Sequence, residues 1–141
     1  MNMNIKHKDF SYLIQFHTYK TSKWINYENI YIYHQVLFFI YEFSQKYVIY
    51  DYHLVITFIY FKRLINIGNI HNNPLFILIF SFSLTIKFWD ESKYICQEIL
   101  IKIKNILYYE YKILKIDFKF LFTLNLFQDS YNLLLNISDN F

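Results

Sequence analysis

The stretch PLFILIFSFSLTIKFWDES, residues 74–92, decides the fold, because it joins a helix start, a long apolar run and an abrupt return to charge. Asn73 suits the N-cap position, and Pro74 suits the first position of a helix. The run from Leu75 to Ile86 then meets its first charged residue at Lys87. A helix that is apolar on nearly every side is buried in a core or in a membrane.

The length of the apolar run argues against a membrane span. Its twelve residues would make about 18 Å of helix, against a hydrocarbon core of about 30 Å. The segment before it carries Asp51, Lys62 and Arg63, and a charge near the bilayer centre costs about 3 kcal/mol. We therefore expect a helix in a protein core, with a small membrane-associated helical protein as the alternative.

Apolar residues three and four positions apart predict further helices on both sides of this stretch. Asp51 is placed to cap one of them. The β-branched and aromatic content of residues 47–61 would also suit strands, but the glycine and turn signals that hairpins need are nearly absent. The sequence thus predicts an all-α fold, with helices at Ile32 to Gln45, Asp51 to Ile65, Pro74 to Trp89, Lys104 to Phe118 and Leu126 to Leu135.

The interior of this fold can also be named. The chain of 141 residues is long enough for one domain with a core. The central helix is expected to be either Leu54 to Ile65 or Leu75 to Phe88. The expected core includes Ile56, Ile59, Leu78, Phe82, Leu107 and Leu114.

Charge and cysteine usage limit the classes of function. The net charge is only +3 and the lysines are spread along the chain, so the electrostatic footprint of a nucleic-acid-binding protein is missing. Cys96 is the single cysteine and cannot form an internal disulfide, which favours a reducing compartment. The N-terminal residues show no signal-peptide pattern. We expect a protein of the cytoplasm, the nucleus or both.

Motifs of catalysis and cofactor binding are not found. With Gly68 as its single glycine, the chain has no phosphate-binding loop or dinucleotide fingerprint. The five histidines never recur at helical spacing, and Cys96 has no histidine nearby, so metal-ligand spacing is lacking. We expect no metal, no cofactor and no enzymatic activity, although another helical scaffold or an enzyme stays an open alternative.

Two charged residues in apolar surroundings stand out. Lys87 ends an otherwise apolar helix, and Glu110 falls inside an apolar arc when residues 104–118 are projected at about 100° per residue. Either both side chains reach solvent at helix edges, Lys87 by extending its aliphatic stem, or they face a protein partner. The arc around Glu110 consists of Ile103, Ile106, Leu107, Ile113 and Leu114.

The order of these segments resembles the cyclin box, and most of all that of the P- or U-type (PHO-type) cyclins. Residues 59–65, IYFKRLI, are similar to the family's YIDRL pattern. The segment NIHNNPLFILIFSFSLTIKFWDE, residues 69–91, resembles the next family helix, which ends in a pattern like AIKFWDD. The later matches are NILYYEYKILKIDFKFLF, residues 105–122, and LFQDSY, residues 126–131.

The resemblance implies a cyclin-box five-helix bundle that binds and activates a cyclin-dependent protein kinase, in cell-cycle or nutrient-linked control. It maps the two kinase-contacting positions of the family onto Lys87 and Glu110, and we expect the adjacent Phe88 and Trp89 to share the contact. A cyclin has no active site; it holds the mobile C-helix of the kinase inward. The implied organisation is an N-terminal extension at 1–28, the box at 29–125 and a C-terminal helix and tail at 126–141.

The chain also departs from the family. Phe39 and Lys62 occupy the positions of an arginine and an aspartate that pair inside the box. Losing both is easier to accommodate than losing one, because a single orphaned buried charge costs several kcal/mol. The segment between Trp89 and Glu110 is shorter than in the family and lacks its Gly-Gly turn, so we expect a reshaped helix there and a divergent or weakly activating cyclin.

Overall fold

The computed structural model describes residues 4–20, 30–66, 74–89 and 122–137, which contain helices and no strand. The prediction of an all-α fold is therefore confirmed. The helices predicted at Asp51 to Ile65 and Pro74 to Trp89 have the observed bounds. The helices predicted at Ile32 to Gln45 and Leu126 to Leu135 each extend slightly further than expected. The expected helix from Lys104 to Phe118 lies outside the described residues. The helices are α1 (His7–Lys20), α2 (Ile30–Lys46), α3 (Asp51–Ile65), α4 (Pro74–Trp89) and α7 (Leu124–Leu135).

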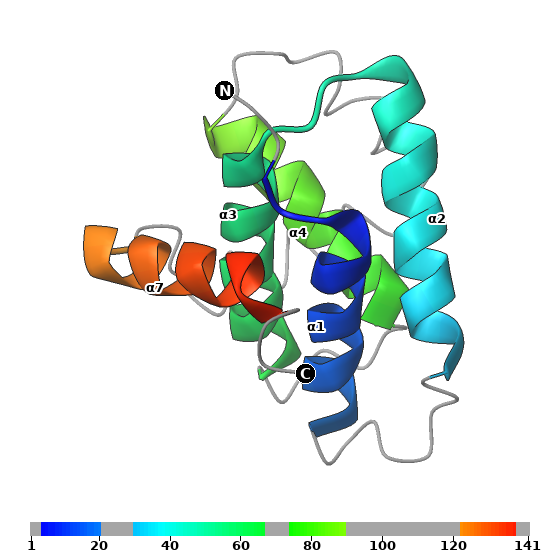
Figure 1. Cartoon of the computed structure of the whole chain (residues 1–141), viewed down its shortest axis with the longest axis horizontal. Helices are drawn as coiled ribbons and strands as arrows, with labels where there is room; N and C mark the ends of the chain where they lie inside the picture. The colour runs from blue at the N-terminus through cyan, green and yellow to red at the C-terminus, as the bar shows by residue number, and fades with distance from the viewer. Residues whose placement is uncertain (1–3, 21–29, 67–73, 90–121, 138–141) are drawn as a thin grey trace, which may run out of the picture.

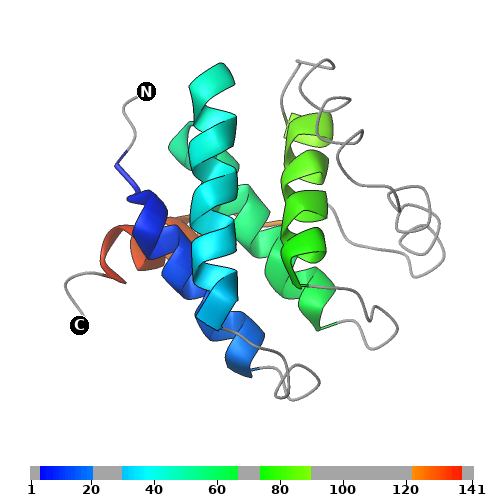
Figure 2. The same ribbon diagram turned by 90° about the vertical axis from the view of Figure 1, so that its right-hand side faces the viewer.

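Helix α3 is the central element of the described bundle. It has its most extensive contact with α4 and also packs on α1 and α7, while α2 packs on α1 and α4. Figure 1 shows α7 lying across α3 rather than along it. Figure 2, turned by a quarter, shows α2 and α4 running alongside each other. Of the two helices that the sequence offered as central, α3 holds that place.

The composition of α3 explains its position. All of its residues are buried except Tyr52, Lys62 and Arg63. The two cations lie in its last turn, where the negative end of the helix dipole stabilises positive charge. The Lys62 ammonium lies 4.5 Å from the centre of the Phe58 ring, so its stem covers apolar surface while the charge stays at the boundary.

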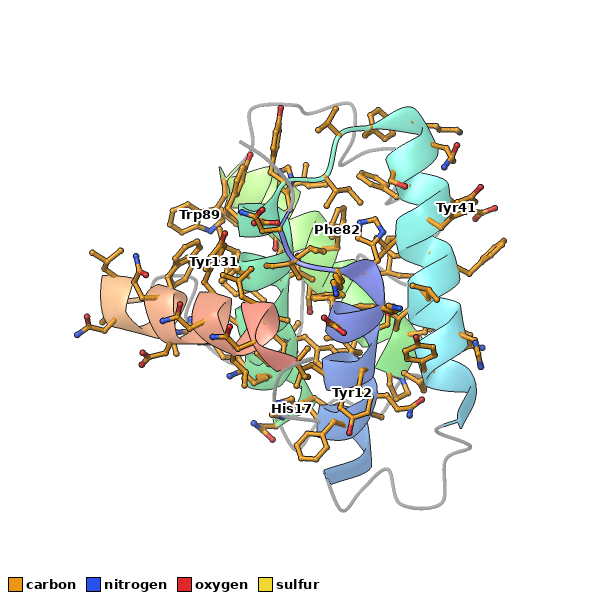
Figure 3. All side chains as sticks on the ribbon, in the orientation of Figure 1. Tyr12, His17, Tyr41, Phe82, Trp89 and Tyr131 are labelled. Carbon is orange, nitrogen blue, oxygen red and sulfur yellow. The ribbon has the colours of Figure 1, made fainter. Side chains whose placement is uncertain are left out.

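The predicted core residues that the structure describes are all buried. Leu107 and Leu114 lie outside the described residues. Phe82 sits among rings, with centroid distances of 4.8 Å to Phe43 and 5.8 Å to Phe39. Figure 3 shows Phe82 between α2 and the rest of the bundle. Ile56, Ile59, Leu78 and Phe82 are 3%, 1%, 1% and 2% exposed.

Helix α4 carries hydroxyl groups into this core without leaving them unpaired. The Ser81 hydroxyl donates to the Ile77 carbonyl at 2.7 Å, and the Thr85 hydroxyl donates to the Ser81 carbonyl at 2.9 Å. The hydroxyl oxygens of Thr57, on α3, and Thr85 are 2.9 Å apart. Because Thr85 already uses its proton within α4, Thr57 is the donor to Thr85. Such internal bonds allow a helix with polar residues to be buried.

Helix α1 belongs to the same core, in the part of the chain, 1–28, that the resemblance implied to be an N-terminal extension. Phe10, Leu13 and Ile14 are almost fully buried and join the core cluster of α3 and α4. These residues are at positions i, i+3 and i+4, which lie on one face of a helix. The described bundle therefore extends in front of residue 29.

The prediction that Asp51 caps α3 is wrong. The N-cap is Tyr50, whose backbone N–H donates to Nδ1 of His53 at 3.0 Å. Asp51 is the first helical residue, and its fully buried carboxylate accepts the N–H groups of Asn4 and Ile5, at 2.9 and 3.1 Å to Oδ1. It also accepts the Tyr131 hydroxyl at 2.8 Å. Asp51 thus ties the N-terminal segment and α7 to the start of α3.

Candidate protein-binding site

The C-terminal end of α4 passes from the core to the surface within one residue. Ile86 is 1% exposed, whereas Phe88 and Trp89 are 49% and 43% exposed and Lys87 is also exposed. A single exposed apolar residue is common on protein surfaces, whereas aromatic residues are enriched at interfaces. These three residues, Lys87, Phe88 and Trp89, form the α4 tip.

Lys87 and Phe88 lie together at the α4 tip. The Lys87 ammonium is 5.8 Å from the centre of the Phe88 ring, within the range of a cation–π interaction. The last turn of a helix also favours a cation through the helix dipole. An ammonium offers three hydrogen-bond donors and no acceptor. The pair therefore suits a partner that presents carboxylate or carbonyl oxygens beside an apolar surface.

Trp89 has a different environment, because its indole is tied back to the core. The indole N–H donates to the Tyr60 hydroxyl of α3 at 2.6 Å. Tyr60 is 0% exposed, so the hydrogen bond joins the exposed end of α4 to the central helix. Burial raises the pKa of the Tyr60 hydroxyl, while the Trp89 hydrogen bond and the charge of Arg63 act in the opposite direction. Tyr60 is thus a neutral acceptor for the indole at physiological pH.

A row of rings continues from Trp89 along α7. The Trp89 and Phe122 centroids are 5.0 Å apart, and Phe122, Phe127 and Tyr131 follow in stacked steps of 6.3 Å. Figure 3 shows Trp89 and Tyr131 on the same side of the molecule, next to α7. The row ends where the Tyr131 hydroxyl meets Asp51. The contact between Trp89 and Phe122 also joins the end of α4 to the residues just before α7.

The structure brings together only part of the predicted site. Lys87, Phe88 and Trp89 are exposed neighbours at the α4 tip, but Glu110 lies outside the described residues, so its proximity to Lys87 stays a prediction. Tyr60 and Phe122 were missed. A tyrosine among the apolar residues of the IYFKRLI segment was the one available signal for Tyr60, since a buried hydroxyl requires a partner.

Phe39 and Lys62, which differ from the cyclin-box pattern that the sequence resembles, both pack against aromatic rings. Phe39 is half-buried and packs edge-on against Phe82. Lys62 is partly buried over Phe58, and burial, followed by the nearby charge of Arg63, lowers its pKa. Neither contact depends on the charge pair that the family carries inside the box.

The part of the chain that the structure describes lacks both a metal-binding cluster and a membrane-spanning helix. It contains no group of three or more histidine, cysteine, aspartate and glutamate side chains that could hold a metal ion. None of its helices has both the length and the apolar character that a membrane crossing requires. Cys96 lies outside the described residues.

Comparisons with family models, curated proteins and solved structures gave no match to this chain. A proposal for its function therefore rests on its own residues and on the order of its segments.

Proposed function

We propose that this chain is a cyclin-like regulatory subunit that binds and activates a cyclin-dependent protein kinase. The observation that carries the proposal is the α4 tip, where a buried helix ends in exposed Lys87, Phe88 and Trp89. These residues lie in the TIKFWDE segment that resembles the end of a cyclin-box helix. The exposed aromatic and cationic end of a core helix supports a partner contact at the position that the resemblance implies.

The chemistry of the α4 tip suits a protein partner. The residues that contribute most to an interface are often aromatic side chains or arginines that become desolvated on binding. Phe88 supplies apolar area, and Lys87 supplies a charge-assisted hydrogen bond, which is stronger than a neutral one. Glu110, where the resemblance places the second contact, would add an acceptor to the same face of the kinase.

The proposed mechanism is a shift of population in the kinase. The kinase needs its C-helix inward for the lysine-glutamate ion pair that positions the phosphates. A subunit that binds this conformation more tightly than the inactive one moves the equilibrium toward it. A full reversal from 1:99 to 99:1 would need a differential affinity of about 10⁴-fold. A rigid surface is needed for such discrimination, and the extensive α3–α4 packing supports the α4 tip.

This role carries expectations about catalysis, cofactors and the cellular compartment. The chain would contribute no catalytic group and no cofactor to the kinase reaction. It would work in the cytoplasm or the nucleus, where its kinase partner acts.

The experiment compares kinase binding and folding in one variant. Lys87→Ala combined with Glu110→Ala should lower the affinity for the kinase by about 2–4 kcal/mol, a factor of about 30–1000, with little change in melting temperature. Lys46→Ala is a matched control, because Lys46 is an exposed lysine in the last turn of α2. The kinase is obtained by capturing the tagged chain from dividing cells.

Three results would count against the proposal. Capture that never yields a cyclin-dependent kinase would remove the partner. A well-folded double variant that binds the kinase as the parent does would remove the role of the two residues. A double variant with a clearly lower melting temperature but little change in kinase affinity would indicate an internal ion pair in place of a docking contact.

A further inference from the structure

The hydroxyl of Tyr60 is placed at a position where packing alone would be served by phenylalanine. Tyr60 is 0% exposed and lies in α3 with Phe58 and Phe61, which are also fully buried. Burying a hydroxyl without a hydrogen bond costs about 1–3 kcal/mol on the evidence of protein variants. The bond that the Tyr60 hydroxyl accepts from Trp89 at 2.6 Å offsets that cost.

The Trp89 indole is held on a second side by Phe122. The two rings are 5.0 Å apart with planes tilted by 35°, and Phe122 also meets Tyr60 edge-on at 6.3 Å. A hydrogen bond and a ring contact from different parts of the chain together set both the position and the rotation of the indole. The exposure of Trp89, 43%, thus belongs to a side chain that is already anchored.

The end of a helix needs such an anchor if it is to present side chains in fixed directions. The last four carbonyl groups of a helix have no partner within it, and helix ends fray. Consecutive residues are rotated by about 100° about the axis, so holding Trp89 also sets the directions of Lys87 and Phe88. Without the anchor the last turn could open, and the ammonium and the Phe88 ring would lose their shared orientation.

We infer that Tyr60 is a positioning residue for the partner-binding end of α4, acting through its hydrogen bond to Trp89. The inference rests on the proposed function and deepens it. Lys87 and Phe88 contact the kinase, while Trp89 presents its exposed edge and keeps its N–H on Tyr60. Kinase affinity thereby depends on a buried hydroxyl that touches no partner atom.

The first test removes only the hydroxyl. Tyr60→Phe should weaken kinase binding by about two- to tenfold, the range that one net hydrogen bond contributes. Tyr131→Phe is the matched control, because its hydroxyl bonds to Asp51 rather than to Trp89, and its kinase affinity should equal that of the parent. Equal affinity of the parent and Tyr60→Phe would overturn the inference.

The second test asks whether Tyr60 acts through Trp89. In a Trp89→Phe background, which has no indole N–H, adding Tyr60→Phe should change kinase affinity no further. An undiminished effect of Tyr60→Phe in that background would show that it acts by general destabilisation and would overturn the inference.

A readout without kinase separates this inference from the proposed function. The chain has two tryptophans, Trp24 and Trp89, so Trp24→Phe leaves one indole N–H resonance in an NMR spectrum. Its hydrogen exchange should be slow in the Trp24→Phe chain and faster when Tyr60→Phe is added. Fast exchange in both would refute the hydrogen bond. A parent chain that binds no kinase would refute the proposed function, and the positioning role with it, even where this exchange difference is seen.

Discussion

Replacing Asp51 by alanine tests whether one buried carboxylate joins three parts of the fold. The side chain is 0% exposed and accepts hydrogen bonds from the backbone of Asn4 and Ile5 and from the hydroxyl of Tyr131. These partners belong to the N-terminal segment and to α7, which are distant in the sequence. The substitution removes the carboxylate that accepts all of these hydrogen bonds.

The expected loss follows from what each donor can do afterwards. Ile5 is 2% exposed, so its N–H is left buried and unpaired, at a cost of about 1–3 kcal/mol. Asn4 is exposed and Tyr131 is half-buried, so water can replace the carboxylate and each loses about 1 kcal/mol. Relief from burying a charge offsets part of this. We expect Asp51→Ala to lower the free energy of unfolding by about 2–4 kcal/mol.

Urea unfolding followed by circular dichroism measures this loss, and hydrogen exchange of the Ile5 amide locates it. Asp129→Ala is the control, because Asp129 is an exposed aspartate on α7, where surface substitutions change stability by less than about 0.5 kcal/mol. Equal unfolding of the two variants, with an unchanged Ile5 amide, would show that Asp51 does not hold these segments together.

Two further predictions concern the core and the pH dependence of stability. Phe82→Ala should destabilise the fold by about 3–5 kcal/mol, a large part of a typical total of about 5–15 kcal/mol, because Phe82 is 2% exposed and packs on Phe43; an unchanged thermal melt would contradict this. Burial lowers the pKa of His7 below its ordinary value of 6.5, so below about pH 6.5 the unfolded chain binds more protons and stability falls with falling pH. His7→Gln should flatten that decline between about pH 7 and 5 in urea unfolding, and a parallel decline in both chains would exclude His7 as its cause.

Local patterns were sufficient to predict where α2, α3, α4 and α7 lie, whereas no helix was predicted at α1. Asn73 and Pro74 are helix-start signals that act on their immediate neighbours, so the start of α4 could be predicted at Pro74, where it is observed. Asn73, the predicted N-cap, lies outside the described residues. The nearly all-apolar run likewise predicted a helix at Asp51 to Ile65, which matches α3, and Ile59 and Phe82 were predicted in the core, where they are observed. These properties depend on residues within a few positions of each other.

The candidate site was predictable to a smaller extent. The break from an apolar run to KFW located the α4 tip, and Lys87 and Phe88 are exposed there as a contact requires. Trp89 was grouped with them, yet its indole N–H is bonded to Tyr60. No spacing rule links those two residues, because they lie on different helices.

The sequence by itself determined the helical class, the place where α4 begins, and the charged and aromatic end of α4. Only the tertiary structure decided that α3 is central and that α1 joins the core. It also decided that Asp51 is a buried anchor and no helix cap. The physical reason is distance along the chain: the hydrogen bonds that Trp89 donates to Tyr60, Asn4 to Asp51 and Tyr131 to Asp51 span 29, 47 and 80 residues. Such contacts form only when packing of the apolar faces brings the helices together.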